Sequence, residues 1–363
     1  MNINFSAFRN KPTRIIANRL EIGIHRFDIN DTLNFGDAIK TVPVQSIAQA
    51  MDEFVQVTAG HCNPQFAALV FTATNNFRVL DWYFPITQML DETELDDFYQ
   101  LVQEIAHHPN FDIQLIGENR ADLTDQMPTC VRHIVAGHIA EVFFYKQNIL
   151  ERFLSNPRHF QLYATPRAFE QDGGVSGGDY NPGRGSIQLV LSRLFEGFNG
   201  ETAGVCPFLH ELGHMLDHFD VGSGRMGQVE GLLPGVSPRD GEAFNPLARK
   251  LFIAGKSLEL ERYLILYQGN FKRGDPLPIG HPYVFQNDGE FIAGYLEMFF
   301  RNPNYFEASN PDLYSAFVEL FGYDPRGAWK QDFPHYVNQN REFYLSGRKP
   351  GKPNLTIPRD GND

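Results

Sequence analysis

Two histidines and a glutamate form the stretch of this chain with the most specific chemistry. His210, Glu211 and His214 follow the pattern H-E-x-x-H. Side chains four residues apart project from the same face of an α-helix, so the two imidazoles can hold one zinc ion through ring nitrogens. The carboxylate of Glu211 lies beside them, where it can take a proton from a metal-activated water. The spacing therefore predicts a helix that carries two zinc ligands and a general base.

Asp217 follows His214 by three residues and falls on the same face of this helix. A carboxylate there can accept the second N–H of a ligand histidine and fix its tautomer, so we expect Asp217 to orient a ligand. The competing interpretation is an ordinary amphipathic helix with two exposed histidines. That alternative has weight, because the motif arises by accident in on the order of a few per cent of chains of this length.

A zinc ion held by two histidines of one helix needs a third protein ligand, and a glutamate from another helix commonly supplies it. A second helix is predicted from Asp288, which can cap it, and its buried face includes Phe291 and Tyr295. Glu290 and Glu297 are two turns apart on this helix. Both can face the same neighbour, so periodicity leaves both as candidates for the third ligand.

Composition and charge restrict the classes of partner. The chain has 363 residues, 42% of them hydrophobic and 21% charged, as in globular proteins large enough for two domains. A net charge of −13 argues against nucleic acid and against an anionic membrane surface. No apolar run is long enough to span a bilayer. The first residues lack a Sec signal, so we expect a cytoplasmic protein, although Sec-independent secretion as an effector would leave no such mark.

The first third of the chain has the pattern of a mixed α/β region. Strands are expected over residues 14–29, 67–74, 77–84 and 111–116, and helices over 44–59 and 92–107, the second capped by Asp91. The chain turns polar around 119–124, and we place a domain boundary there. A long helical stretch is expected over 125–154. His133 and His138 lie on it five residues apart, a poor spacing for shared ligation, and are expected to be packing or surface residues.

A glycine-rich loop covers residues 173–185 and lacks the Gly-Lys-Ser/Thr ending of a phosphate loop. It precedes a β-type run at 186–191, which could be an edge strand that pairs with an extended substrate. The alternative is a plain hairpin connection. The segment 221–241 could form a lid or a surface loop. Helices are expected in two pieces over 244–267, and the chain from residue 348 is expected to be extended or disordered.

These motifs resemble two known groups, the zinc peptidases of the Mlc titration factor A family and the catalytic domain of anthrax toxin lethal factor. The shared features are H-E-x-x-H-x-x-D, ending at Asp217, and Tyr-x6-Glu-Phe-x-Ala, from Tyr283 to Ala293. The likeness to the titration factors continues through Glu297 to Asp324 and covers roughly residues 123–325. Departures are Asp288-Gly289 in place of Pro-Ala, Ile292 in place of Phe, and Gly294 within the helix, all expected to affect packing rather than chemistry.

The resemblance implies a gluzincin-type zinc metallopeptidase with Zn²⁺ as its cofactor. It assigns the metal ligands to three residues, His210, His214 and Glu290. Glu211 would be the general base, and Tyr283 would hydrogen-bond the oxyanion of the tetrahedral intermediate. Glu297 matches a second glutamate of the family and would support the site, as Asp217 does, rather than bind the metal.

The implied fold is of the α+β class. A zincin-like metallopeptidase domain, mostly helical with a small sheet, is expected at residues 123–330. A smaller α/β domain at residues 1–122, with no counterpart in the titration factors, would precede it. A C-terminal helix and extended tail would follow at residues 331–363.

The expected activity is hydrolysis of peptide bonds in a protein or peptide substrate by a metal-activated water. One alternative is a zinc-fold binding protein that sequesters a regulatory protein partner, since the titration factors bind a repressor. Another is a host-directed effector or toxin protease. Glu211 favours catalysis, because a pure scaffold has no need of a general base.

Overall fold

The computed structural model describes residues 13–16, 18–22, 25–33, 42–58, 84–196, 204–220, 222–227, 246–329 and 332–357. Contacts divide the chain into two compact units. The first unit consists of Met1–Phe144, His159–Asp179 and Gln188–Glu201, and the second of Tyr145–Arg158, Tyr180–Ile187 and Thr202–Asp363. Within the described ranges, no helix is both long enough and apolar enough to cross a membrane.

The first unit begins with short antiparallel strands. β1 (Thr13–Ile16), β2 (Arg19–Ile22) and β3 (His25–Asp28) form a three-stranded sheet in chain order, and β4 (Thr32–Leu33) pairs with β5 (Val42–Pro43). Helix α1 (Val44–Thr58) follows directly. The strands and the helix expected over 14–59 are confirmed. The strands expected at 67–74 and 77–84 lie almost wholly outside the described residues.

Two helices and a strand of the first unit match their sequence signals closely. Helix α3 (Glu92–Ala106) starts with a capping box in which Asp91 accepts from the backbone of Thr93 and Glu94. Strand β6 (Phe111–Ile116) buries alternate residues. Helix α4 (Thr129–Phe143) packs against α3 and buries His138, whose ring lies edge-on to Phe84.

The single helix expected over 125–154 is wrong. The structure has a 3-10 turn η5 (Thr124–Gln126), then α4, then a separate helix α5 (Gln147–Phe153) that belongs to the second unit. Pro128 precedes α4 and cannot donate to a preceding turn. Lys146 leaves helical geometry, with φ −130° and ψ 50°, and its carbonyl accepts from Ile149 and Leu150 to begin α5.

A small sheet has the strand order β6-β7-β9-β8, with β7 at Arg158–Tyr163, β8 at Gly178–Asn181 and β9 at Ser186–Val190. Short helices α6 (Pro166–Gln171) and α7 (Leu191–Leu194) flank it in the sequence. The run expected as an edge strand is β9, which lies between two strands and is buried along its whole length. The glycine-rich loop itself supplies the edge strand β8, and its Gly177 and Gly185 take positive φ values of 82° and 60° directly before β8 and β9.

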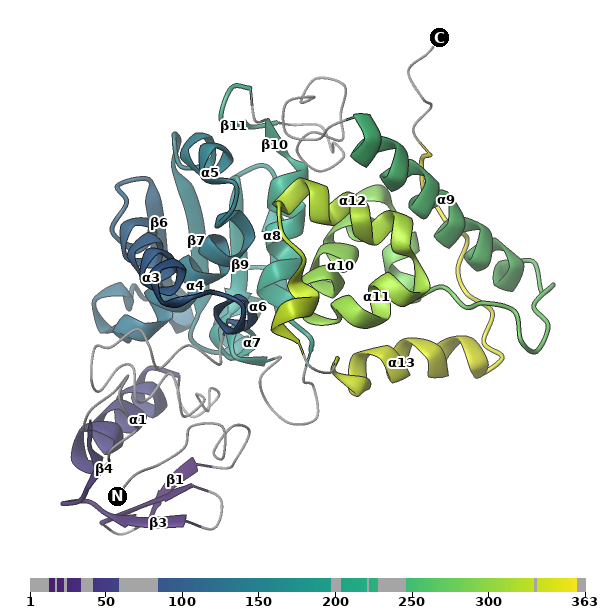
Figure 1. Ribbon diagram of the computed structural model, residues 1–363. Helices are drawn as coiled ribbons and strands as arrows, with labels where there is room; N and C mark the ends of the chain where they lie inside the picture. Colours follow the sequence, from purple (N-terminus) through teal and green to yellow (C-terminus); the bar gives the residue numbers. More distant parts are fainter. Residues whose placement is uncertain are drawn as a thin grey trace. The chain divides into compact units, whose positions relative to one another are not determined.

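The second unit is mostly helical (Figure 1). Its elements are α8 (Pro207–Asp217), β10 (Phe219–Asp220), β11 (Arg225–Met226), α9 (Pro246–Tyr267), η9 (Pro282–Phe285), α10 (Asp288–Arg301), α11 (Pro303–Ser309), α12 (Pro311–Phe321), η10 (Pro325–Ala328) and α13 (Pro334–Leu345). Helix α10 packs against α8, and α12 packs against α9. The fold is therefore α+β, mostly helical with a small mixed sheet, as expected.

Helix α9 is continuous, so the expected division into two pieces is wrong. Gly255 in its middle does not break the helix, because tertiary packing requires a residue without a side chain there. A Cβ at this position would lie 2.5 Å from the backbone nitrogen of Leu313 in α12. The close contact of two helix backbones outweighs the weak helix propensity of glycine.

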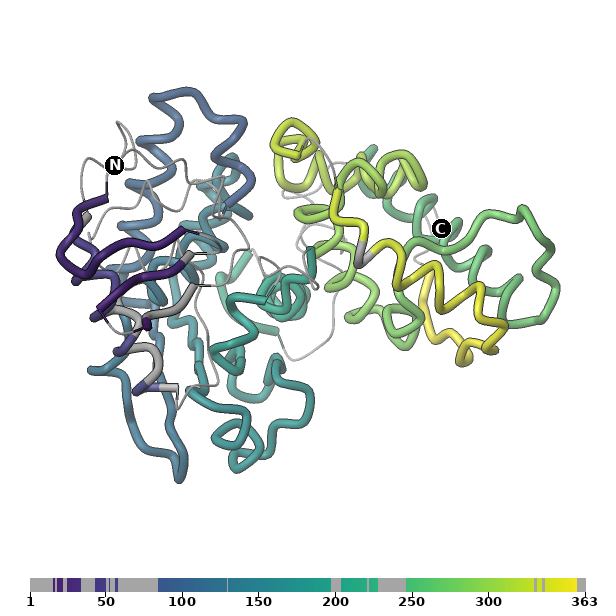
Figure 2. The backbone as a smooth tube through the Cα atoms, turned by 90° about the horizontal axis from the view of Figure 1, so that it is seen from below, coloured from purple at the N-terminus to yellow at the C-terminus, as the bar shows by residue number. Residues whose placement is uncertain are grey.

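The C-terminal segment is extended, as expected, and it is held in place up to residue 357 (Figure 2). The carbonyl of Gly351 accepts from the Tyr263 hydroxyl at 3.1 Å, and the amide of Asn354 donates to Phe285 O at 2.9 Å. The amide of Thr356 donates to Asp288 Oδ1 at 2.9 Å. The segment therefore lies against the elements that carry the candidate site.

Candidate metal centre

Helix α8 places the two motif histidines one turn apart. Pro207 occupies its first turn, where a missing N–H costs nothing, and Phe208, Leu212 and Met215 anchor its opposite face in the core. The rings of His210 and His214 have centroids 5.0 Å apart. Both side chains keep nearly a fifth of their surface exposed. The predicted helix and the shared face are confirmed.

Helix α10 reaches the histidines because α8 has no side chain at Gly213. A Cβ there would lie 2.7 Å from Cα of Ala293 in α10, closer than any ordinary contact. The start of α10 is fixed by Asn287, whose side chain accepts from the amide of Glu290 at 2.8 Å. The expectation that Asp288 is the cap is wrong by one residue, because the Asp288 carboxylate accepts from Lys256 and from the C-terminal segment instead.

The carboxylate of Glu290 faces both histidines. Its Oε2 lies 3.1 Å from His210 Nε2 and 3.4 Å from His214 Nε2. These three groups are the cluster with metal-binding geometry found among the described residues, with ligand atoms within 4.8 Å of one another. Two imidazoles and one carboxylate are the donor set of catalytic zinc sites. The three side chains therefore supply a donor set that fits a zinc ion.

The electrostatics of the cluster favour a positive charge at its centre. Burial by itself lowers the pKa of His210, but hydrogen bonds to Glu290 and Glu297 outweigh it and raise that pKa to about 10. Burial likewise raises the pKa of Glu290, but its bonds to the two histidines hold the pKa well below the usual range. Both shifts favour the charged forms of the two groups, with a proton on the His210 ring and an ionised carboxylate at Glu290. A metal cation satisfies the same carboxylate without that proton.

Glu297 lies behind His210 rather than beside the point where the three donors converge. Its Oε1 accepts from the amide of Cys206 at 2.6 Å, and its Oε2 lies 3.7 Å from His210 Nδ1. This contact directs Nδ1 of the ring toward Glu297 and Nε2 toward Glu290. The two glutamates that periodicity could not distinguish therefore lie on opposite sides of the His210 ring, Glu290 at Nε2 and Glu297 at Nδ1.

Tyr283 is carried by the 3-10 turn η9 and reaches the same carboxylate. Its hydroxyl donates to Glu290 Oε1 at 2.7 Å, while 45% of the residue's surface remains exposed. The turn packs on α10 at Gly294, where a Cβ would lie 2.4 Å from Cγ1 of Val284. Gly294, a departure from the titration factors, therefore allows η9 to lie close to α10.

Glu211 and Asp217 are both buried on α8, with 8% and 4% of their surface exposed. Each is placed on the helix that presents the histidines, as the motif predicts. The contact expected between Asp217 and a ligand histidine stays a prediction. The segment expected as a lid lies largely outside the described residues, and residues 222–227 form part of the short β10–β11 hairpin.

A buried lysine supports the start of α10, and the motifs gave no indication of it. Lys256 is fully buried and its Nζ lies 2.6 Å from Asp288 Oδ1 and over the ring of Phe291. Burial lowers the pKa of Lys256, and the carboxylates of Asp288 and Asp217 raise it. This ammonium therefore supplies positive charge to a site rich in carboxylates.

One sequence signal could have revealed this lysine. The helical spacing of the buried residues Phe252, Tyr263 and Leu266 continues through Lys256 and Glu259. A charged residue in such a row of buried apolar positions is expected to be buried and to form an ion pair. Glu259 is also fully buried, with its carboxylate 2.7 Å from Arg262 Nη1.

Comparison with known proteins agrees with the motifs. The family model described as glucose-regulated metallo-peptidase M90 matches residues 72–322. The matched range includes α8, η9 and α10, and hence every residue of the site. It also begins about fifty residues before the domain boundary expected near residue 122. No curated protein matches the chain.

Proposed function

The chain belongs to the glucose-regulated metallo-peptidase family M90, and on that basis we propose that it is a zinc-dependent peptidase with His210, His214 and Glu290 as ligands. The observation that carries the proposal is the position of the Glu290 carboxylate, 3.1 Å and 3.4 Å from the two ring nitrogens. A buried Glu211 on the same helix as the histidines adds a base that metal binding alone does not require.

Zinc bound there would polarise a peptide carbonyl and acidify the attacking water. Glu211 would accept a proton from that water and return it to the leaving amine nitrogen. The exposed Tyr283 hydroxyl would leave Glu290 Oε1 and donate to the carbonyl oxygen as negative charge develops on it. Glu297 and Asp217 would hold the imidazoles in the orientation that presents Nε2.

The substrate follows from the family as a protein or peptide. We keep the cytoplasmic location as a prediction from the sequence. The buried base on α8 favours hydrolysis over the rival role of sequestering a regulatory partner, which needs only a surface. A role as an exported effector shares the same chemistry and would differ only in the protein cleaved.

The test compares the zinc-loaded protein, the chelated protein and the Glu211→Gln variant on a fluorogenic casein substrate. Gln keeps the shape of Glu but accepts no proton, so zinc content should stay at one per chain while turnover falls by about 10² to 10⁴-fold. Glu261→Gln is the matched control, because Glu261 is exposed on α9 and should retain full activity. Turnover that survives in both Glu211→Gln and the chelated protein would refute the proposal.

A further inference from the structure

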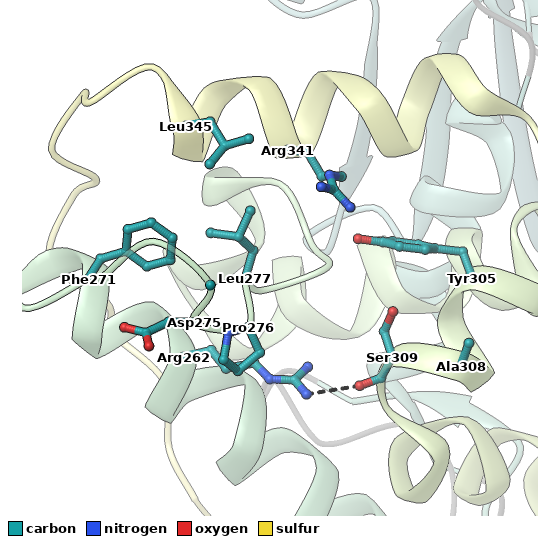
Figure 3. Close-up of a pocket in the computed structure, with 11 residues that line it drawn as sticks. Arg262, Phe271, Asp275, Pro276, Leu277, Tyr305, Ala308, Ser309, Arg341 and Leu345 are labelled. Atoms are coloured by element: carbon teal, nitrogen blue, oxygen red, sulfur yellow. Dashed lines mark hydrogen bonds between the residues drawn. The ribbon is translucent and has the colours of Figure 1, made fainter.

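The second unit contains a cavity of about 470 Å³ (Figure 3), and no residue of the metal centre is among those that line it. Its walls come from α9, the loop that follows α9, α11 and α13. Apolar side chains cover much of it, among them Phe271, Leu277 and Leu345. Cavities of this volume are typical of sites for small molecules.

Two guanidinium groups and a phenol face this cavity. Arg341 on α13 is exposed and, among the residues that the structure describes, has no ion-pair partner. Figure 3 shows its guanidinium directed toward the Tyr305 hydroxyl of α11. Arg262 of α9 is mostly buried, and its Nη2 donates to Ser309 O at 3.0 Å. Its Nε is buried and has no acceptor in the described part of the chain.

The charged residues that line the cavity are Arg262, Arg341 and Asp275, and Arg262 forms an ion pair with the buried Glu259. Asp275 is the one acidic residue among those that line the cavity, and its carboxylate accepts from the amide of Lys272 at 2.7 Å. An exposed guanidinium without a carboxylate partner is a strong donor for oxyanions, because its planar N–H groups match them in pairs. The apolar wall opposite would contact the rest of a ligand.

We propose that this cavity is a binding site for a small organic oxyanion with an apolar body, either a carboxylate or a phosphate ester. Arg341 bonds the oxyanion, the Tyr305 hydroxyl donates to it, and the apolar body lies against Phe271 and Leu277. The binding does not depend on the proposed peptidase activity. It adds a second ligand site to the unit that contains the metal centre.

The walls of the cavity are connected by hydrogen bonds to α10 and to the segment that precedes η9. Arg262 Nη1 donates to Glu259 Oε1 at 2.7 Å, and Glu259 Oε2 accepts from the amide of Ile279 at 2.9 Å. The same Oε2 accepts from the hydroxyl of Tyr295, which lies on α10 between Glu290 and Glu297. A buried carboxylate thus joins the cavity wall to the metal-centre helix.

Helix α13 makes a second connection. Next to Arg341, the side chain of Asn340 donates to Ile279 O at 3.0 Å, and the Tyr344 hydroxyl donates to Gly280 O at 2.7 Å. An occupant that draws α13 toward α11 therefore acts on the segment just before Tyr283. Occupancy of the cavity should change kcat/KM of the peptidase, and this part of the inference rests on the proposed function.

Binding is tested by ¹⁹F NMR on the zinc-loaded full chain with three probes, 4-fluorophenylacetate, 4-fluorophenyl phosphate and the neutral 4-fluorophenylacetamide. At least one anion should bind saturably and the neutral amide should not. The anion that binds more tightly shows whether the cavity prefers a carboxylate or a phosphate ester. Arg341→Gln should weaken binding about tenfold or more, the usual effect of losing a charge-assisted bond. Arg348→Gln is the control, because Arg348 is exposed and does not line the cavity.

Repeating the titration after zinc removal separates the cavity from the metal centre. Binding that persists without zinc and is lost in Arg341→Gln supports the cavity, whether or not the protein cleaves peptides. Absence of binding by both anions, equal binding by Arg341→Gln, or loss of binding with the zinc would overturn it. If the anion binds but leaves kcat/KM unchanged, the connection to Tyr283 is refuted.

Discussion

Replacing Gly213 with alanine should separate the two helices that build the metal centre. The added Cβ would lie 2.7 Å from Ala293 Cα, whereas ordinary contacts begin near 3.4 Å, so α8 and α10 must move apart by about 0.7 Å. Metal–ligand distances tolerate only about 0.2 Å. A displacement of this size between His210 and Glu290 should weaken zinc binding by about 10².

The same substitution has a cost in stability, because inserting a methyl group into a packed core typically costs about 1–3 kcal/mol. The measurement is zinc affinity by competition with a chromophoric chelator, together with the urea midpoint of the zinc-free protein. The chelator reports the geometry of the site, and the midpoint reports the helix packing alone.

Gly255→Ala is a matched control for this experiment. A Cβ at Gly255 would meet the backbone of Leu313 at 2.5 Å, a clash of the same kind between α9 and α12. It should destabilise the protein to a similar extent and leave zinc affinity unchanged. If Gly213→Ala binds zinc as tightly as the natural chain, or if both variants lose zinc equally, the inference that α8–α10 contact sets the ligand geometry is refuted.

Three further predictions concern the same site. Tyr283→Phe should keep zinc but lower kcat by about 10² to 10³-fold with little change in KM, as single-turnover assays would show; an unchanged kcat would remove Tyr283 from the reaction. Glu290→Ala should lose zinc, whereas Glu297→Gln should retain it with affinity lowered about 10- to 100-fold, and metal analysis showing the reverse would exchange their roles. Because the pKa of His210 in the metal-free protein is about 10, zinc must displace a proton at neutral pH. Affinity should rise about tenfold per pH unit up to that pKa and fall on acidification, and calorimetry in buffers of different ionisation enthalpy should detect about one proton released. Folding raises the pKa of His210 from 6.5 to about 10, so protonation of this ring stabilises the metal-free folded protein. This contribution to the free energy of unfolding is complete below pH 6.5 and disappears as the pH rises through 10.

Local sequence determined the parts of the structure that depend on neighbours along the chain. The i, i+4 spacing of His210 and His214 fixed a shared helix face, and the Asp91 capping box fixed the start of α3. These features need only helix geometry and nearby backbone donors. The α+β class and the resemblance to a metallopeptidase family also followed from motifs, and both are confirmed.

Features that depend on distant contacts were predicted incorrectly or left open. α9 was expected in two pieces but is one continuous helix, in which Gly255 packs closely against Leu313 of α12. The run at β9 was expected at a sheet edge, but the pairing of β8 from the glycine-rich loop encloses it. Strand pairing joins residues whose partners no local pattern identifies.

Helical periodicity placed Glu290 and Glu297 on one face and could not separate them. The crossing of α10 over α8 at Gly213 brings Glu290 to the Nε2 side of His210 and Glu297 to the Nδ1 side. Lys256 likewise pairs with the Asp288 carboxylate only because α9 contacts the first turn of α10. The sequence thus determined which side chains could carry the chemistry. Helix packing decided which of them converge on one point. The close backbone contact between α8 and α10 sets the distances between side chains of the two helices, and the periodicity of each helix alone does not determine these distances.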